Sequence, residues 1–234
     1  MKLEKVVPFG RSLDEYKNMF ALSEGDLEKA IVGVGDGPAS FNAEMWGLGK
    51  SVVSIDPLYV FQAEEIERQF DAVVDDIIEQ VKSTPADWVW SYHGSPDYLK
   101  QNRRRVLRRF IADYDGGKAD GRYLVGELPG LDFEDGRFEL ALCSHLLFLY
   151  SGHLSYEFHL ASILEMLRVA AEVRIFPLLT LMLERSPYVQ PVMKAVTAMG
   201  FLANVEMVNY ELQKGGDEML RIRRSARPLN GGRA

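Results

Sequence analysis

Short apolar runs alternate with longer amphipathic segments along most of this chain, and this alternation restricts the fold more than any other sequence feature. The runs expected to be buried strands are residues 29–34, 51–55, 122–125, 138–144 and 172–178. The segments between them carry apolar residues at helical spacing, most clearly over 66–81. Strands that alternate with helices predict a mostly parallel sheet with helices on both faces.

The last third of the chain predicts a different connection. Two further strands are expected at residues 205–212 and 219–223, and Lys214-Gly215-Gly216-Asp217 between them has the composition of a hairpin turn. A hairpin of this kind would add an antiparallel edge to the sheet.

Several helix boundaries follow from capping signals. Ser12 is expected to begin a helix with Glu15 as its capping-box partner. Pro38 is expected in the first turn of a helix that stops at Gly49. A helix that starts at residues 95–96 is expected to end at 115–117, where two glycines follow an aspartate.

Composition limits the class of protein. The length of 234 residues suits one domain over 1–234, and a net charge of −7 argues against nucleic acid as a partner. The single cysteine, Cys143, forbids an internal disulfide and fits a reducing compartment.

Residues 1–10 lack the apolar core of a signal peptide, and no apolar run is long enough for a membrane span. We therefore expect a cytoplasmic protein without a membrane partner. The four histidines and Cys143 show no metal spacing, so no metal site is expected.

A glycine-rich turn follows the first predicted strand and reads Val32-Gly33-Val34-Gly35-Asp36-Gly37-Pro38. Glycine there permits positive φ and lets a ligand lie against the backbone. Asp56 stands at the end of the next strand, where a carboxylate can accept hydrogen bonds from both hydroxyls of a ribose. Turn and acid together predict an adenosine-binding site. A turn that only connects strand and helix is the alternative.

The glycine spacing distinguishes between adenosine ligands. Dinucleotide-binding turns follow G-x-G-x-x-G/A, whereas this turn follows G-x-G-x-G with Pro38 at the position that needs a small residue. Pro38 removes an N–H group from the helix start, and Asp36 adds a negative charge, so both disfavour a phosphate. An acidic turn instead favours a ligand with an ammonium or sulfonium group.

At these positions the sequence resembles the class I S-adenosylmethionine-dependent methyltransferases, over residues 29–224 apart from a stretch near 60–115. Residues 33–37 resemble the first motif of that family, and Asp56 matches its ribose-binding acid. Residues 131–140 resemble the segment that leads into its fourth strand, and residues 143–147 resemble the loop that faces the methyl group. The ending around residues 210–216 resembles its final reversed hairpin.

The resemblance implies an α/β fold of the Rossmann-like, doubly wound kind, with a mostly parallel seven-stranded sheet. It also implies S-adenosyl-L-methionine as cofactor. The residues that it assigns to cofactor binding are Gly33, Gly35, Asp36, Gly37, Asp56, Pro57, Leu58, Glu127, Leu128 and Ser144. The glycines would touch the methionine part, Asp56 would hold the ribose, and the next two residues would flank the adenine. The family often carries an acid two residues before its first glycine, and Ile31 occupies that place here. Either Asp36 takes that role or the cofactor is held less tightly.

His145 directly follows the fourth strand, where a substrate would approach. It is a candidate catalytic general base, and a histidine positioned in the core is the alternative. Positioning can supply roughly 7–11 kcal/mol of a methyl-transfer barrier, whereas a base adds about 10²–10⁴-fold. Methyl transfer therefore does not require a base. Arg11 and Tyr16 in the leading helix are further candidates, to close over the cofactor.

Residues 57–121 exceed what a single crossover helix needs and are expected to form a helical insertion that covers the substrate pocket. A dense positive run within it consists of Lys100, Arg103, Arg104, Arg105, Arg108 and Arg109. One interpretation is a solvated face paired with acidic neighbours, and the other is contact with an anionic substrate or nucleic acid.

The predicted function is a methyltransferase that uses S-adenosylmethionine to methylate a small-molecule substrate. The alternative is a regulatory or interaction module that binds the cofactor without turnover, which Ile31 and the uncertain base motivate. A nicotinamide-dependent oxidoreductase is disfavoured by Pro38 and the glycine spacing.

Overall fold

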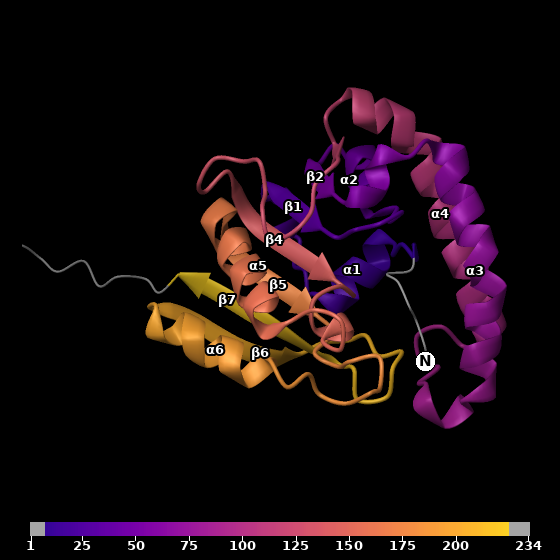
Figure 1. Cartoon of the computed structure of the whole chain (residues 1–234). Helices are drawn as coiled ribbons and strands as arrows, with labels where there is room; N and C mark the ends of the chain where they lie inside the picture. The colour runs from indigo at the N-terminus through magenta and orange to yellow at the C-terminus, as the bar shows by residue number, and fades with distance from the viewer. Residues whose placement is uncertain (1–7, 225–234) are drawn as a thin grey trace, which may run out of the picture.

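A computed structural model describes residues 8–224, and at its centre is a seven-stranded sheet in the order β3-β2-β1-β4-β5-β7-β6 (Figure 1). The strands are β1 (Ile31–Val34), β2 (Val52–Ile55), β3 (Tyr123–Leu124), β4 (Phe138–Ser144), β5 (Ala170–Phe176), β6 (Phe201–Met207) and β7 (Glu218–Arg224). The first five are parallel, and β7 is antiparallel to both β5 and β6. The expected α/β fold, a mostly parallel seven-stranded sheet with a terminal antiparallel hairpin, is confirmed.

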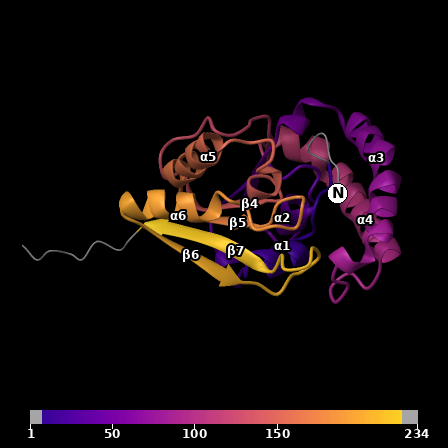
Figure 2. The same ribbon diagram turned by 60° about the horizontal axis from the view of Figure 1, so that its bottom comes forward.

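Helices cover both faces of the sheet because successive strand residues point to opposite sides. Ile31 packs into one apolar core with α1 (Leu13–Met19) and α2 (Phe41–Gly47). Val32 packs into a second core with α5 (Tyr156–Val169) and α6 (Val189–Ala198). Figure 2 shows α5 and α6 on the same side of the sheet.

Two long helices, α3 (Ala63–Ser83) and α4 (Pro96–Ala119), lie side by side beyond the end of the sheet to which β4 points (Figures 1 and 2). The apolar face predicted for α3 is buried except at Val73, which is half-buried. Its buried members are Ile66, Phe70, Val74, Ile77, Ile78 and Val81. On the outer side, Lys100 Nζ lies 2.7 Å from Asp75 Oδ1 and joins the two helices. They make up most of residues 57–121 and face the carboxyl ends of the strands.

The capping predictions hold at two helix starts. Ser12 and Glu15 form the expected capping box of α1. The hydroxyl of Ser95 accepts a hydrogen bond from the N–H of Tyr98, and Pro96 is the first residue of α4.

Two boundary predictions are wrong, for different reasons. The helix α2 begins at Phe41 and not at Pro38, because Pro38 still belongs to the irregular segment that connects β1 to α2. The fourth helix continues past residues 115–117 to Ala119. Gly117 does not end that helix: a Cβ atom there would lie 2.3 Å from Tyr123 Cε2, so the glycine permits close packing of the helix on β3.

The strand predicted at residues 205–212 is wrong: β6 is Phe201–Met207, and the connection from β6 to β7 is longer than the predicted turn at 214–217. The sixth strand ends at Met207, because the chain then leaves the sheet and approaches the connection between α3 and α4. The N–H of Val89 donates to the carbonyl of Leu212 at 2.8 Å, and the N–H of Lys214 donates to the carbonyl of Asp87 at 3.0 Å. This loop therefore ties the end of the sheet to the long helices.

Within residues 8–224, no helix combines the length and the apolar character that a membrane span requires. Residues 1–7, which belong to the segment considered for a signal peptide, lie outside the described part of the chain.

Candidate functional site

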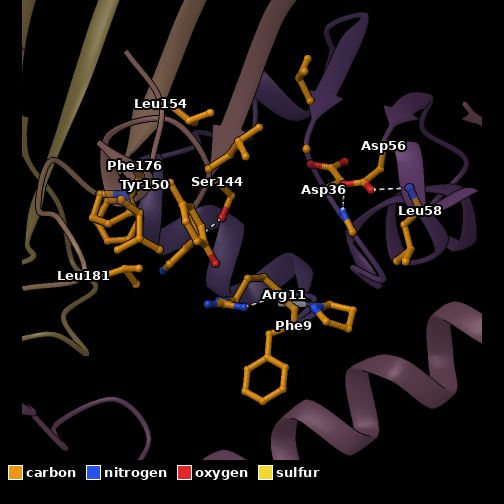
Figure 3. Close-up of a pocket in the computed structure, with 18 of the residues that line it drawn as sticks. Phe9, Arg11, Asp36, Asp56, Leu58, Ser144, Tyr150, Leu154, Phe176 and Leu181 are labelled. Carbon is orange, nitrogen blue, oxygen red and sulfur yellow. Dashed lines mark hydrogen bonds between the residues drawn. The ribbon is translucent and has the colours of Figure 1, made fainter. Parts of the chain in front are cut away.

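A pocket of about 880 Å³ lies beyond the carboxyl ends of β1, β2, β4 and β5 (Figure 3). Parallel sheets of this kind bind ligands at that edge, where the turns between strand and helix converge. The opposite wall comes from α3 and α4, which contribute Ile77, Val81, Leu99 and Arg103.

Each glycine of the turn after β1 serves a different purpose. A Cβ atom on Gly33 would collide with the side chain of Asp36, and one on Gly35, at φ +70°, would lie 2.6 Å from Leu146 Cδ2. Gly37, at φ +54°, faces open space, with no atom within 4 Å of a Cβ position. Gly37 is therefore the glycine that leaves the backbone accessible from the pocket.

Asp36 lies beneath the turn, and its carboxylate is held by two hydroxyl groups. Tyr16 donates to Oδ1 at 2.6 Å, and Ser54 donates to Oδ2 at 2.7 Å. Burial raises the pKa of Asp36 to about 6, against the two hydrogen bonds that lower it, and nearby Asp56 raises it further. Both oxygens are thus engaged within the protein, and Tyr16 supports the turn from below.

Asp56 joins the glycine turn to the segment after β2. Its Oδ2 atom accepts from the N–H of Gly37 at 2.8 Å, and its Oδ1 atom accepts from the N–H of Leu58 at 2.8 Å (Figure 3). Burial raises the pKa of this carboxyl, and the two backbone N–H groups oppose that effect. Because a carboxylate oxygen can accept two hydrogen bonds, each oxygen retains one acceptor position.

The end of β4 brings Ser144 and His145 to the pocket. The Ser144 hydroxyl lies 2.8 Å from His145 Nδ1, and the backbone N–H of His145 donates to the carbonyl of Phe176 at 2.7 Å. His145 has a φ of +54°, and its ring packs edge-on against Phe176. Burial lowers its pKa well below the usual value, and the charges of Arg11 and Arg103 lower it further. The imidazole is therefore neutral at pH 7.

The structure brings nearly all the predicted site residues together. Those that line the pocket are Gly35, Asp36, Gly37, Asp56, Pro57, Leu58, Glu127, Leu128, Ser144 and His145. Gly33 does not line it, because the folded-back side chain of Asp36 covers that position. Arg11 lines the pocket as expected of a residue that could close over a ligand, whereas Tyr16 lies under the turn.

A buried polar cluster on the far wall of the pocket was not predicted from the sequence. Glu15, expected only as a capping residue, accepts two hydrogen bonds from Arg103 Nη1, at 2.7 and 3.0 Å. The Tyr210 hydroxyl donates to Glu15 at 3.2 Å and lies 3.0 Å from His93 Nε2. Burial alone would raise the pKa of Glu15, but Arg103, Arg11 and the capping contacts bring it down to about 2. The cluster therefore contains an ionised, fully buried carboxylate.

One signal for this cluster is present in the sequence. Leu99, Arg103 and Leu107 recur at intervals of four, which sets Arg103 on the apolar stripe of its helix. The rest of the positive run is superficial: Lys100 and Arg104 pair with acids of α3, as a solvated face requires. The positive run thus consists of one buried residue, Arg103, and a set of surface residues, Lys100, Arg104, Arg105, Arg108 and Arg109.

Comparisons with known proteins give one clear relative. No established family profile matches the chain. The uncharacterized protein MJ0045 of Methanocaldococcus jannaschii is 34% identical over 225 residues, which span 96% of this chain and 99% of that protein.

Solved structures resemble the chain more distantly. Magnesium protoporphyrin IX methyltransferase (ChlM) from Synechocystis PCC 6803 with bound SAM has a TM-score of 0.49 and 15% identity, over 91% of this chain and 78% of that one. A SAM-dependent methyltransferase from Methanosarcina mazei has a TM-score of 0.45 and 12% identity, over 87% of this chain and 94% of that one. The sequence relationship, which extends over nearly the whole of both chains, establishes that the protein belongs to the family of MJ0045.

Proposed function

We propose that this protein is an S-adenosylmethionine-dependent methyltransferase that acts on a small molecule. The observation that carries the proposal is the Asp56 carboxylate, which bridges the N–H groups of Gly37 and Leu58 at the rim of the pocket. The bridge fixes an acid beside the exposed glycine backbone and leaves acceptor positions for two adjacent ribose hydroxyls.

The site suits an adenosyl thioether better than a diphosphate. A diphosphate needs free N–H groups and a positive environment at a helix start. Here the turn carries Asp36, the N–H of Gly37 is already bound, and Glu44 lies in the first turn of α2. Leu58, Pro57 and Leu128 offer apolar surface beside Asp56 for an adenine. The open space at Gly37 would let the cofactor lie against the turn.

When bound, the cofactor supplies a methyl group that is already activated on a sulfonium. The chain's own residues then have to hold the acceptor in line with that methyl group and exclude water. The two long helices that face the strand ends perform the second task, because they close the pocket with apolar side chains such as Ile77, Val81 and Leu99. Positioning of this kind can account for roughly 7–11 kcal/mol of barrier reduction.

His145 contributes less as a base. Its neutral ring can accept a proton, but a pKa far below 7 makes the transfer unfavourable. The bond between Ser144 and Nδ1 sets the orientation of the ring. In this proposal His145 positions the acceptor, and the acceptor gives up its proton to solvent or loses none.

A small-molecule acceptor is favoured by the concave, mostly apolar pocket. Two of the surface cations that a nucleic acid would contact are instead paired with acids, Lys100 with Asp75 and Arg104 with Asp71. The net charge of −7 also opposes a polyanion.

Calorimetry with S-adenosylhomocysteine and S-adenosylmethionine tests the proposal. We expect micromolar binding of both, and a loss of at least tenfold in Asp56→Ala. Glu24→Gln is the control: it removes an exposed acidic charge outside the pocket, so its affinity should stay within about threefold of the parent protein. Absence of binding at high micromolar concentration, or equal effects of the two substitutions, would refute the proposal.

Turnover separates this proposal from the alternative of a cofactor-binding module, which the weak basicity of His145 supports. Incubation with isotopically labelled S-adenosylmethionine and a panel of small molecules should give a labelled product from at least one. If cofactor binds but no panel member is labelled, the module becomes the better account.

A further inference from the structure

Two arginine side chains lie buried in the wall of the pocket with donors left over. Arg11 is 9% exposed and Arg103 is 1% exposed, and both line the pocket. Among the described residues, Arg11 Nε and Arg103 Nη2 have no hydrogen-bond partner. A buried donor without a hydrogen-bond partner destabilises the folded protein. The two unpartnered donors therefore indicate that a ligand binds to the guanidinium groups of Arg11 and Arg103.

The local charges leave an excess of one positive charge. Glu15 is the carboxylate that faces both arginines, and of the two only Arg103 donates hydrogen bonds to it. Arg11 donates only to the backbone carbonyls of Phe9 and Gly10. Burial and the charge of Arg103 together lower the pKa of Arg11. Burial likewise lowers the pKa of His93 to about 3, which leaves it neutral.

The cluster of Arg11, Glu15, Arg103 and Tyr210 lies near the end of β5, whereas Asp56 lies at the end of β2. Arg103 and Tyr210 both donate hydrogen bonds to Glu15. The Tyr210 ring lies 5.7 Å from the ring of Phe176, the last residue of β5. The sheet order separates β2 from β5 by three strand spacings, or about 14 Å. A ligand group held at Arg103 is therefore separate from a ribose held at Asp56. Figure 3 shows Arg11 between Phe9 and Ser144, the last residue of β4.

The pocket around this end is apolar. Leu149, Leu154, Phe158 and Leu181 line it on the side of β4 and β5, and Trp88 and Leu99 line it on the side of the long helices. An apolar body could fill this space while an acidic group reaches the arginines.

On these grounds, and provided that the proposed function holds, we infer that Arg11 and Arg103 bind the carboxylate of the methyl acceptor, which is a monocarboxylic acid with an apolar body. A carboxylate matches the excess of one charge and the planar fork of a guanidinium. A phosphate monoester would bring close to two negative charges beside the ionised Glu15, which the site does not balance.

The test uses octanoate and 1-octanol, which share an apolar chain and differ in the acidic group. Calorimetry on the full chain, with and without saturating S-adenosylhomocysteine, should give at least tenfold tighter binding of octanoate. Arg11→Gln should reduce that preference by about tenfold or more, since charge-assisted hydrogen bonds are lost. Arg108→Gln, an exposed arginine of the same helix as Arg103, is the control and should leave it unchanged.

Further measurements decide whether the carboxylate that binds to the arginines belongs to the methyl acceptor or to the cofactor. S-adenosylhomocysteine should bind Arg11→Gln within twofold of the parent protein. If its affinity falls tenfold while that of 5′-methylthioadenosine does not, the arginines hold the amino-acid carboxylate of the cofactor, and the inference is overturned. Tighter binding of octyl phosphate than of octanoate, or no preference for octanoate over octanol, also overturns it.

Arg11→Lys covers the case in which the glutamine variant does not fold. Lysine keeps the positive charge but lacks the paired N–H donors of the guanidinium group, so the preference for octanoate should fall at least threefold. An unchanged preference contradicts the inference. Failure of the parent protein to bind S-adenosylhomocysteine, with the octanoate preference intact, would reject the proposed function and leave the carboxylate site in place.

Discussion

A Cβ atom on Gly33 would lie 1.9 Å from the Oδ2 atom of Asp36, so the buried carboxylate occupies the space that a side chain at residue 33 would need. Tyr16 and Ser54 hold the carboxylate in that position. The first glycine of the turn therefore makes room for the protein's own acid, whereas Gly37 opens toward the pocket.

Gly33→Ala should lower the free energy of unfolding by about 1–3 kcal/mol, because the added methyl group displaces Asp36 from its two hydroxyl partners. Gly116→Ala, in α4 with no atom near its Cβ position, should instead raise stability by up to about 1 kcal/mol. Urea unfolding measures both. Equal stability of Gly33→Ala and the parent protein would contradict this view of the turn.

Asp36 should make stability depend on pH in a predictable direction. Its pKa is raised from 3.8 to about 6 in the folded protein, so the stabilising contribution is complete below pH 3.8 and is lost as the pH rises through 6. The unfolding free energy of the parent protein minus that of Asp36→Asn should therefore fall by about 2 kcal/mol between pH 4 and pH 7. Groups common to both proteins cancel in this difference. A difference that is constant with pH would exclude the raised pKa.

Glu15→Gln should destabilise the protein by about 3–5 kcal/mol, because it leaves the buried Arg103 without a counter-charge. Glutamine can still complete the capping box with Ser12, so the loss reports the charge and not the helix cap. Glu24→Gln is the control, since its ion pair with Lys17 is exposed, and it should leave the thermal midpoint unchanged. Similar effects of the two substitutions would show that Glu15 and Arg103 do not depend on each other.

His145→Asn should lower kcat by less than about tenfold. Asparagine tolerates the positive φ at this position, so the backbone is retained while the imidazole is lost. If the protein has the proposed activity, its rate profile between pH 6 and pH 9 should show no ionisation of His145, because burial lowers the pKa of this group well below its usual value. A loss of kcat by 10² or more would identify His145 as an essential base.

Much of the fold follows from local sequence patterns. The run around Val32 and the seven-residue strand that ends at Ser144 are apolar on both sides because helices cover both faces, and such strands are readily recognised. The errors lie where a residue serves a distant contact. Gly117 has the local appearance of a helix end, but it allows Tyr123 to approach, and this depends on the tertiary structure.

The candidate site was predictable in part for the same reason. Asp56 and the glycine turn lie at adjacent strand ends, so the sheet topology alone brings them together. The role of Asp36 was not predictable, since the two hydroxyls that hold it come from α1 and β2. Arg103 belongs to a helix that could have faced in any direction, although its place on an apolar stripe was a usable signal.

Glu15 joins parts of the chain that are far apart in sequence: Arg103 lies 88 positions later and Tyr210 lies 195 positions later. During synthesis, the wall of the pocket therefore stays incomplete until Tyr210 has left the ribosome. A product interrupted before that point could form most of its strands, yet it would lack the hydroxyl and the loop that close this wall. The wall that we propose to bind the acceptor thus depends on residues from both ends of the chain, and it can be completed only after Tyr210 has been synthesised.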